Sequence, residues 1–574
     1  MADASRQAVP EVDVAICGGG LAGLCLARQL RRERPDLSVT VIEREVGPLP
    51  DAAHKVGESM AETGAYYLTD VLGMRDLLEE TQLPKLGLRF FFPGTAGASF
   101  CDRPEMGLSR FPETMSFQID RGRFETELRR QIVKDGTVLR EGCRVEGIEL
   151  GQDGAPHRIE FRRSDGNREA LSASWVIDAT GRKRFLQRQL GLSRRCRGEA
   201  HNAVWFRVRG RVELSNLTPN TEAEWHGRVM PNDRWHSTSH LVDKGYWVWL
   251  IPLASECTSI GIVATDRLHP LAGYQTWPRA KAWLETHEPD LAGLIAGREI
   301  LDFKALHDYS YSANRVFSAD RWGSVGESGV FADPLYSPGT DLIGISNCCA
   351  TRLIGQERDG EDIRDAAEHH SRFVIALNES LTRSIQSGYE VFGCAPAMAA
   401  KLLWDFAAAW AFVAPQMFNG VFLDAQKSSA FRASGSRFFS LSLRMQQLFR
   451  DWAGQSTGRT GFRWFDYLSV PRIAALRTRN LQPGKDLDQL LSDHQENLKD
   501  MEELAQILFL AALQDVHPDD AGTLATPVWL NAWGIVLDPD KWANTGLRQP
   551  KSQPRDLSSW HRALAPLFQP ACPP

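Results

Sequence analysis

A short strand that runs directly into a glycine-rich turn constrains this chain more than any other feature. Residues 12–17, VDVAIC, form an apolar run, and residues 18–23, GGGLAG, follow at once and open an amphipathic helical segment. Gly18, Gly20 and Gly23 stand in a G-x-G-x-x-G pattern, in which glycines permit a tight turn and let backbone amides approach a pyrophosphate at the positive end of a helix. The pattern predicts the first strand, turn and helix of a dinucleotide-binding α/β unit.

A second apolar run places an acidic residue where such a unit needs one. Residues 37–43, LSVTVIE, end at Glu43. In dinucleotide-binding folds a carboxylate about 20 residues beyond the turn hydrogen-bonds the ribose hydroxyls. The alternative is a structural turn with a surface glutamate. We favour the nucleotide site, and we add Ala22 and Arg44 to its predicted contacts.

The size and charge of the chain limit the remaining possibilities. With 574 residues it exceeds the roughly 250–300 at which one hydrophobic core stops growing, so two or more lobes are expected. Its 66 Lys and Arg residues stand against 72 Asp and Glu residues, the net charge is −6, and the sequence contains no basic block. This composition argues against nucleic acid as a partner.

Cysteine spacing and the N-terminal sequence favour a cytoplasmic protein with reduced thiols. The ten cysteines show no CxxC spacing and no pairing with histidine clusters, so neither a metal site nor a disulfide framework is expected. The N-terminal residues lack the basic and apolar regions of a signal peptide. The most apolar long stretch, residues 395–415, is interrupted by Lys401 and Asp405, which favours a buried or amphipathic helix over a membrane span.

Three later segments resemble motifs of the FAD-dependent monooxygenase superfamily. Residues 172–182, SASWVIDATGR, resemble its Ala-Thr-Gly segment, and residues 117–128, FQIDRGRFETEL, resemble its D-R-x-x-F/L-x-x-x-L segment. Residues 321–329, RWGSVGESG, stand in the place of its second Gly-Asp motif. The resemblance implies FAD rather than NAD and a Rossmann-type α/β fold of the superfamily's GR2-like class. It also implies cofactor contacts at Arg121, Arg123, Asp178, Gly181 and Glu327, the last of which replaces the usual Asp.

The stretch FADPLYSPG, residues 331–339, narrows the resemblance to one family. It reads F-x-x-P-x-x-S-x-G through Phe331, Pro334, Ser337 and Gly339, a spacing that resembles the signature of flavin-dependent halogenases. The resemblance implies that Pro334 and Gly339 lie at the flavin. Prolines restrict φ, so the turn is rigid, as suits a flavin face where halide must react before water does. The alternative is a turn that only packs the flavin ring, as in any monooxygenase of this fold.

Residues 245–253, GYWVWLIPL, resemble a second halogenase motif. They contain W-x-W-x-I-P, with its tryptophans at Trp247 and Trp249. The family usually has Gly directly before the first tryptophan, whereas this chain has Tyr246 there. The resemblance implies that the two tryptophans bar the substrate from direct contact with the flavin.

Lys85 is the predicted catalytic residue. Family members carry a lysine some way beyond a VGE-type segment, and here QLPKLGLRFFF, residues 82–92, follows HKVGES, residues 54–59. Leucines flank Lys85, and burial would lower the pKa of its amine and favour the neutral form. The resemblance implies that this amine accepts electrophilic chlorine or hydrogen-bonds hypohalous acid. The alternative is a surface lysine at the start of a strand.

Pro338 departs from the pattern of tryptophan-type halogenases. In those relatives a Thr-Gly pair after the motif's serine holds halide through backbone amides, whereas proline has no amide hydrogen. The predicted halide contacts here are therefore Ser337, Gly339 and Thr340, with halide binding as the open point.

The expected function is halogenation of an electron-rich phenolic, pyrrolic or indolic substrate in secondary metabolism, such as antibiotic biosynthesis. The resemblance implies oxygen, chloride or bromide, and reduced FAD from a separate flavin reductase. The substrate is either free or tethered to a carrier protein. Two alternatives stay open: a flavin monooxygenase of the same fold that hydroxylates or oxidises its substrate, and a binding module in which this chemistry has lapsed.

The domain organisation follows from the periodicity of the sequence. We expect residues 1–355 to form the FAD-binding core, with an antiparallel substrate-side sheet in about residues 85–120 and 200–310. Residues 356–574 carry helical periodicity and are expected to form a mainly helical region that caps the substrate site.

Overall fold

The computed structural model describes residues 10–568 except 52–54, 95–98, 197, 232, 459, 525–529 and 550–556. The chain divides into two units, each built from three segments. Unit 1 comprises Met1–Gln82, Ile119–Gly198 and Ser310–Thr382, and unit 2 comprises Leu83–Gln118, Glu199–Tyr309 and Arg383–Pro574. These units divide the chain by its contacts, and the domain boundary expected at residue 355 stays a prediction.

Unit 1 is organised around a parallel sheet. β1 (Glu11–Cys17) pairs in parallel with β2 (Val39–Ile42) on one side and with β10 (Arg168–Asp178) on the other. β7 (Val138–Arg140) continues the sheet beyond β2, and β19 (Trp322–Ser324) continues it beyond β10. The strand order is β18-β19-β10-β1-β2-β7. Antiparallel additions come from β8 (Cys143–Glu149), β9 (His157–Arg163) and β18 (Phe317–Ser318), and a separate two-stranded sheet pairs β11 (Ser193–Arg195) with β17 (Tyr311–Ala313).

The register of this sheet brings the carboxyl ends of its central strands to one edge. Cys17 pairs with both Ile42 and Asp178, and Asp178 pairs with Ser324. Each strand ends where a predicted motif begins: the glycine turn, Glu43, the Ala-Thr-Gly segment and the Gly-Glu-Ser segment. This edge is where ligands bind in parallel α/β sheets.

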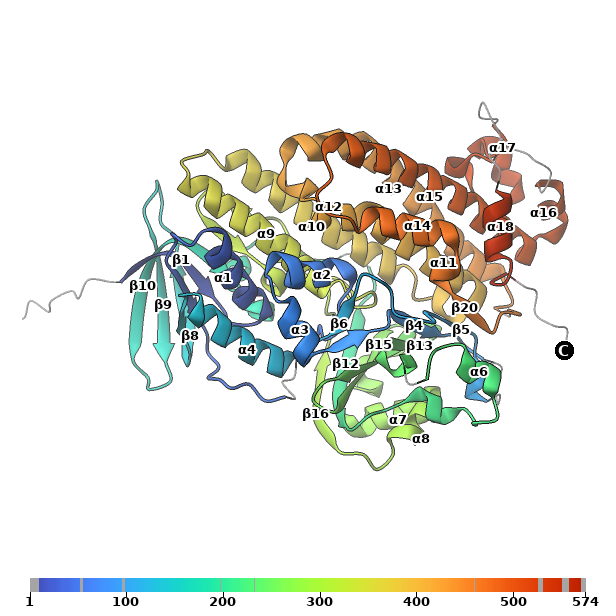
Figure 1. Ribbon diagram of the computed structural model, residues 1–574, viewed down its shortest axis with the longest axis horizontal. Helices are drawn as coiled ribbons and strands as arrows, with labels where there is room; N and C mark the ends of the chain where they lie inside the picture. The colour runs from blue at the N-terminus through green and yellow to red at the C-terminus, as the bar shows by residue number, and fades with distance from the viewer. Residues whose placement is uncertain are drawn as a thin grey trace, which may run out of the picture. The chain divides into compact units, whose positions relative to one another are not determined.

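Helices cover the sheet of unit 1. α1 (Leu21–Glu33) contacts both α4 (Arg121–Lys134) and α9 (Gly339–Arg358), and Figure 1 shows α1 and α4 lying over the strands. α1 buries Leu24, Leu26, Ala27 and Leu30 among others, which gives it an apolar face toward the sheet. The shorter helices are α2 (Glu62–Tyr66), α3 (Arg75–Thr81) and α5 (Phe185–Gln189), and the π-helical segment η1 spans Tyr67–Val71. α10 (Arg364–Gln386) carries the chain from unit 1 into unit 2.

Unit 2 contains an eight-stranded sheet in the order β16-β12-β15-β14-β13-β4-β5-β20. Its centre is formed by β12 (His201–Arg209), β15 (Cys257–Thr265), β14 (Tyr246–Leu253) and β13 (Thr238–Asp243), each antiparallel to the next. β4 (Leu88–Phe91) joins β13 in parallel. β16 (Ile300–Leu306) forms one edge, and β5 (Glu105–Gly107) continues the sheet from β4 to β20 (Trp464–Asp466) at the other edge. A separate short sheet pairs β3 (Leu83–Lys85) with β6 (Ser116–Gln118).

One face of this sheet packs against two helices. Inward side chains such as Val248, Ile260 and Phe206 form a hydrophobic core with residues of α7 (Trp277–His287) and α8 (Pro289–Ile295). Figure 1 shows both helices lying against these strands. Burial of this apolar face fixes which side chains of each strand point to the other face.

The C-terminal part of unit 2 is helical. Its main helices are α11 (Ala395–Ala408), α12 (Ala414–Phe418), α13 (Ala425–Gln455), α14 (Pro471–Asn480) and α15 (Leu487–Val516), followed by the shorter α16 (Pro518–Leu524), α17 (Trp542–Thr545) and α18 (Ser558–Leu564). The α/β class, the antiparallel-rich second sheet and the helical C-terminal region expected from the sequence are therefore confirmed.

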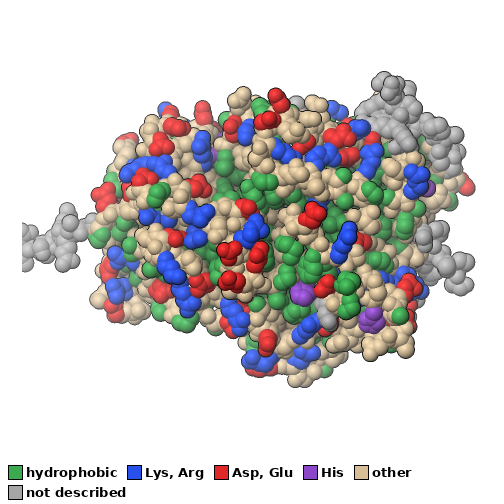
Figure 2. Space-filling view, viewed as in Figure 1, with side chains coloured by type: hydrophobic (Ala, Val, Ile, Leu, Met, Phe, Trp, Pro, Cys, Tyr) green, Lys and Arg blue, Asp and Glu red, His purple; other side chains and the backbone are tan. Residues whose placement is uncertain are grey.

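Within the described part of the chain, Ala395–Phe418 alone is long and apolar enough to cross a membrane, and 72% of its most apolar window is buried in the protein. Lys401 lies within it, and its ammonium group donates to Asp405 at 2.7 Å and to Gln446 at 2.6 Å. These bonds satisfy a charge that is otherwise costly to bury. The segment is therefore built as a core helix. On the molecular face seen in Figure 2, acidic and basic side chains are intermixed.

Candidate functional site: a nucleotide cradle and a tryptophan-bearing sheet

The first and last glycines of the turn after β1 are required by close packing. Gly18 has φ +117°, and a Cβ atom there would lie 2.3 Å from the carbonyl oxygen of Ala179. A Cβ atom on Gly23 would lie 2.0 Å from the carbonyl oxygen of Gly18. Both positions therefore exclude a side chain.

Gly20 serves a different purpose. It is the N-cap residue of α1, with an extended backbone that any residue can adopt, and no described protein atom lies within 4 Å of the place a Cβ would take. This open space adjoins the N-terminus of a 13-residue helix, where the first N–H groups lack intrahelical partners and attract anions. Gly20 thus borders open space at a helix N-terminus, where a pyrophosphate can approach the backbone amides; we call this place the cradle.

The later motifs pack around the beginning of α1. The Val325 amide donates to the carbonyl of Asp178 at 3.0 Å, which ties the Gly-Glu-Ser segment to the Ala-Thr-Gly segment. A Cβ on Gly326 would lie 2.9 Å from the Cβ of Ala22. The Asn347 side chain of α9 donates to the carbonyl of Ala22 at 3.0 Å. Four segments far apart in sequence therefore enclose one site in unit 1.

Glu43 lies beside the turn, as its position after β2 predicts. Its carboxylate is buried and accepts hydrogen bonds from the amides of Gly19 at 2.5 Å and Glu45 at 2.8 Å. The neighbouring Arg44 is mostly exposed and pairs with Glu45 at 3.1 Å. The ribose contact of Glu43 and the cofactor contact of Arg44 stay predictions.

Asp178 shapes the turn that follows β10. Its carboxylate accepts hydrogen bonds from the Thr180 amide at 2.9 Å, the Thr180 hydroxyl at 2.7 Å and the Leu186 amide at 2.8 Å. Burial raises the pKa of Asp178, although these donors oppose the shift. Gly181 follows with φ +59° and with no described atom within 4 Å of a Cβ position. The structure thus gives Asp178 an internal bonding role, and its predicted cofactor contact is untested.

Arg121 and Arg123 differ sharply in their surroundings. Arg121 donates to the fully buried Glu125 at 2.5 and 2.9 Å, and Glu125 also pairs with Lys55. Burial acts to raise the pKa of Glu125, but Arg121 and Lys55 outweigh it and hold the pKa below its usual value. Arg123 is half exposed and pairs with Asp51 at 3.3 Å. Arg121 is therefore held rigidly at the start of α4, whereas Arg123 lies at the surface.

Glu327 and Phe331 meet the same aromatic residue. The hydroxyl of Tyr311 donates to the backbone carbonyl of Glu327 at 2.7 Å. Tyr311 also exchanges backbone hydrogen bonds with Phe331, and their ring centroids lie 6.0 Å apart. The first residue of the halogenase-like signature thus anchors the loop that leads into it.

The rest of that signature forms a strained turn at the start of α9. Ser337 has φ +62°, which is uncommon for a residue with a side chain, and its amide donates to the carbonyl of Pro334 at 3.0 Å. The Ser337 and Ser59 hydroxyls lie 2.9 Å apart, which ties the turn to the KVGES segment. Pro338 is the N-cap residue of α9. The missing amide hydrogen therefore falls just outside the helix.

The first turn of α9 contains backbone amides without intrahelical acceptors and one buried hydroxyl. Gly339, Thr340 and Asp341 are its first three residues, whose amides have no intrahelical acceptor. The Thr340 hydroxyl is buried, with 1% of the residue exposed, and lacks a hydrogen-bond partner within the described residues. Asp341 accepts from the Gly64 amide at 2.8 Å. A buried hydroxyl at a helix N-terminus is suited to receive an anion.

Lys85 lies in unit 2 and is buried, with 2% exposed. It ends β3, where it pairs with Ser116 of β6. The next residue, Leu86, donates its amide to the carbonyl of His236 at 3.0 Å. The backbone on both sides of Lys85 is therefore held by hydrogen bonds, and its catalytic role stays a prediction.

Trp247 and Trp249 lie on the same face of β14, with centroids 5.6 Å apart. Trp249 lies flat over the neighbouring strand, because a Cβ on Gly261 would come within 2.2 Å of its indole. Its indole N–H donates to the Ser259 hydroxyl at 3.3 Å. On β13, His240 stacks on Phe90 at 4.4 Å and lies 5.5 Å from Trp247. Aromatic rings therefore cluster on this face of the β-sheet.

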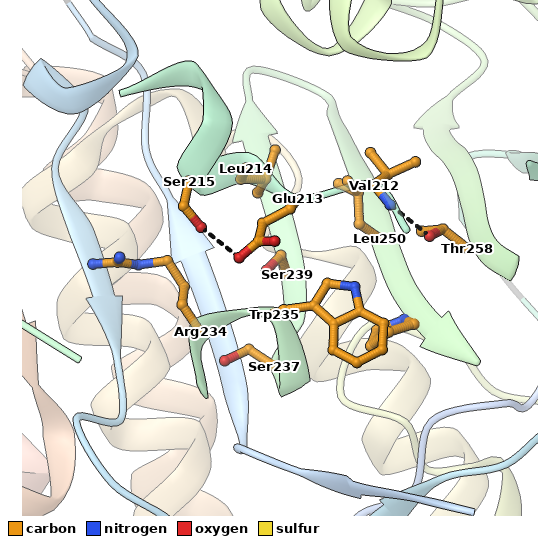
Figure 3. Close-up of a pocket in the computed structure, with 11 residues that line it drawn as sticks. Val212, Glu213, Leu214, Ser215, Arg234, Trp235, Ser237, Ser239, Leu250 and Thr258 are labelled. Atoms are coloured by element: carbon orange, nitrogen blue, oxygen red, sulfur yellow. Dashed lines mark hydrogen bonds between the residues drawn. The ribbon is translucent and has the colours of Figure 1, made fainter. Parts of the chain in front are cut away.

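A cavity of about 20 Å³ lies elsewhere in unit 2. Figure 3 shows Arg234, Trp235 and Ser237 at its wall and the 3.0 Å hydrogen bond from Ser215 to Glu213. This volume accommodates one water molecule, and an aromatic substrate does not fit. We therefore do not assign the substrate to this cavity.

The geometry of unit 1 fits FAD. The helix N-terminus at Gly20 offers amides for a pyrophosphate, the closely packed glycines allow the approach, and Glu43 lies beside them. Residues 11–265 match the family model described as an FAD binding domain. This part of the chain is therefore similar to the FAD binding domains that the model describes.

The chain is also similar to curated halogenases. A flavin-dependent halogenase of Dictyostelium discoideum is 26% identical over 395 residues, covering 64% of this chain and 63% of that protein. A flavin-dependent halogenase of Armillaria mellea is 26% identical over 388 residues, covering 64% of this chain and 70% of its own length. A sulochrin halogenase of Aspergillus terreus is 26% identical over 390 residues, covering 62% of this chain and 66% of that protein. The chain is therefore similar to flavin-dependent halogenases over about two thirds of its length.

Solved structures support the same fold. The halogenase PltM in complex with phloroglucinol and FAD superposes with a TM-score of 0.60 at 16% identity, covering 86% of this chain and 96% of that one. The flavin-dependent brominase Bmp2 superposes with a TM-score of 0.53 at 21% identity, covering 66% of this chain and 87% of that one.

Several residues that shape this halogenase-like site were missed by sequence reasoning. Ser59 and Glu125 lie within quoted motifs, so their positions carried a signal, although no role was assigned to them. Gly261 sits in an apolar strand where only the register reveals the indole above it. Tyr389, which binds Trp247, lies 142 residues away and carried no signal.

Proposed function

We propose that the protein is a flavin-dependent halogenase that places chlorine or bromine on an electron-rich aromatic substrate. The family and the relatives support this proposal at the level of a halogenase-like FAD oxidoreductase. Reduced FAD, delivered by a separate flavin reductase, would supply the activation of oxygen that oxidises the halide.

The first turn of α9 is the observation that carries the proposal. It combines the buried Thr340 hydroxyl, which lacks a partner in the described structure, with amides that have no intrahelical acceptor at the start of a 20-residue helix. These donors favour a bound anion, and Ser337, with φ +62°, shapes the turn that leads into them. The contact of Asn347 with Ala22 places α9 directly against the helix of the nucleotide cradle.

Unit 2 would supply the residues that act on the substrate. Trp247 and Trp249 would separate the substrate from the flavin, as their resemblance to the halogenase motif implies. Their indoles are buried and fixed on one face of the sheet. The Lys85 amine would hydrogen-bond the oxidised halogen species and direct it to the aromatic ring. Lys85 is only 2% exposed, so protein atoms rather than bulk water surround it. These surroundings would determine the reactivity of its amine.

One observation favours a second candidate function. Pro338 stands where tryptophan-type halogenases have a threonine, and it cannot donate an amide hydrogen to halide. Without bound halide, the same fold would hydroxylate or oxidise its substrate, or would retain FAD without turnover.

We further propose a free or carrier-tethered aromatic substrate and a reducing, cytoplasmic setting. The halogenase PltM, which shares this fold, has been crystallised in complex with phloroglucinol, an aromatic phenol. Nine cysteines within the described residues are free thiols, which supports the reducing setting.

The test is an assay with a flavin reductase, NADH, FAD, oxygen and a panel of phenols, pyrroles and indoles, run with chloride, with bromide and without halide. Mass spectrometry should detect products with the isotope pattern of bromine only when bromide is present. An oxygenated product with no halide dependence would establish the monooxygenase alternative, and FAD binding without any product would establish the lapsed module.

A further inference from the structure

Trp247 is anchored by a residue from the C-terminal helical region. Its indole N–H donates to the hydroxyl of Tyr389 at 2.9 Å, and both side chains are buried, with 2% and 1% exposed. An indole has one donor and no acceptor, and a buried donor without a partner is costly. The Tyr389 hydroxyl therefore satisfies the single polar group of this tryptophan.

Tyr389 also holds the backbone that precedes Trp247. The Gly245 amide donates to the Tyr389 carbonyl at 2.9 Å, so one residue fixes both the turn before β14 and the indole that follows it. Gly245 has φ +82°, and a Cβ there would lie 2.5 Å from Leu268, so this turn has little freedom to shift.

Tyr389 is itself held from several sides. Its hydroxyl shares a 3.1 Å hydrogen bond with the hydroxyl of Tyr309. Its ring packs against His201 at 4.4 Å with an interplanar angle of 66°, and against Phe392 at 4.8 Å. A buried group with this many contacts has one orientation, which it imposes on its hydrogen-bond partner.

The two tryptophans are therefore fixed by different means. Trp249 is placed by the sheet itself, because its indole fills the space left by Gly261 and its N–H bond to Ser259 is longer, at 3.3 Å. Trp247 depends on a hydroxyl from a segment that follows α10 and lies outside the matched FAD binding domain.

We propose that Tyr389 is a positioning residue that holds the indole of Trp247 in its shielding orientation and so determines how much of the consumed oxygen becomes halogenated product. This inference rests on the proposed function. Loss of the hydroxyl would let the indole rotate about its side-chain torsions. The indole would then shield less well, and more of the consumed oxygen would be lost as hydrogen peroxide.

The experiment compares Tyr389→Phe with the parent protein. Product per oxygen consumed should fall about threefold to tenfold, the range that loss of one neutral hydrogen bond produces. Released peroxide should rise correspondingly, while bound FAD stays stoichiometric. Ultraviolet resonance Raman spectra should show the shift in the indole band that reports a weakened N–H hydrogen bond, a readout that needs no turnover.

Two further variants separate positioning from general stability. Tyr309→Phe removes a hydroxyl from the same cluster but leaves the bond between Trp247 and Tyr389, so its coupling ratio and indole band should stay close to the parent. In a Trp247→Phe background, adding Tyr389→Phe should not reduce coupling further, because the group that it positions is gone.

Three outcomes would overturn the proposal: an unshifted indole band, an unchanged coupling ratio in Tyr389→Phe, or an equal loss in Tyr309→Phe. If the parent yields an oxygenated product instead of a halogenated one, the halogenase proposal fails, and the ratio of that product to oxygen still tests Tyr389. A parent without any product would overturn both.

Discussion

The two units of this protein differ in whether backbone atoms or side chains form their candidate sites. In unit 1 the cradle consists mainly of backbone: amides at the start of α1, and glycines whose Cβ atoms would meet carbonyl oxygens at 2.0 and 2.3 Å. In unit 2 the tryptophan-bearing face consists of side chains from β4, β13 and β14, held by rings and hydroxyls from other segments. The first site depends on residues that lack side chains, and the second depends on particular side chains in particular orientations.

This difference predicts how each site responds to substitution. A backbone site fails when any Cβ enters it, whereas a side-chain site loses function in steps, as one contact after another is removed. The four predictions below test this contrast.

The largest effect is expected for Gly20→Val. The extended backbone at Gly20 accepts valine, so the protein should fold, but the branched side chain would occupy the pyrophosphate cradle. Purified protein should lack the visible absorbance of bound FAD after loading. Gly273→Val is the matched control, because that glycine also has no described atom within 4 Å of its Cβ position and lies in unit 2. If the Gly20→Val protein still binds FAD stoichiometrically, the assignment of this glycine turn to pyrophosphate binding is wrong.

Lys85→Ala should remove halogenated product while leaving FAD binding and oxygen uptake in place. A decrease of about a hundredfold or more is expected, as for loss of a group that acts directly on the reacting species. Product is measured by mass spectrometry and oxygen by electrode. The exposed Lys304, changed to Ala, serves as the control in the same unit. If the Lys85→Ala protein forms halogenated product at a rate near that of the parent, Lys85 has no catalytic role.

Gly261→Ala should displace the Trp249 indole, since the new methyl group would lie within 2.2 Å of it. Overpacking of this kind lowers the free energy of unfolding by about 1–3 kcal/mol. Urea unfolding measures this loss, which should be smaller when Trp249→Leu is present in the same chain. If Gly261→Ala lowers the free energy of unfolding equally with and without Trp249→Leu, the new methyl group does not contact Trp249.

The smallest effect is expected for Pro338→Thr, which adds an amide hydrogen at the N-cap of α9. One hydrogen bond to a charged group is worth about 1.5–3 kcal/mol at most, and loosening of the turn will offset part of it. The halide concentration for half-maximal product should therefore stay equal or fall by up to about tenfold. Titrations of halide with product and peroxide measured together test this. A higher halide requirement with more peroxide would show that Pro338 shapes the halide site.

The sequence predicted unit 1 better than unit 2. The spacing of Gly18, Gly20 and Gly23 predicts both the turn and its partners, because a glycine requirement is local and leaves a pattern in the chain. Glu43 was likewise placed beside the turn, where the structure finds it. Asp178 shows the limit: its motif is local, but the donors that occupy its carboxylate come from the fold of the next turn.

The sequence by itself determined the strand, glycine turn and helix of the nucleotide cradle, the α/β class and the similarity to halogenases. Only the tertiary structure decided that Thr340 is buried without a partner, that Gly261 makes room for Trp249, and that Tyr389 holds Trp247. The physical reason is the range of the interactions. Backbone turns are dictated by neighbouring residues, whereas burial and side-chain hydrogen bonds depend on segments that meet only after sheets and helices have packed.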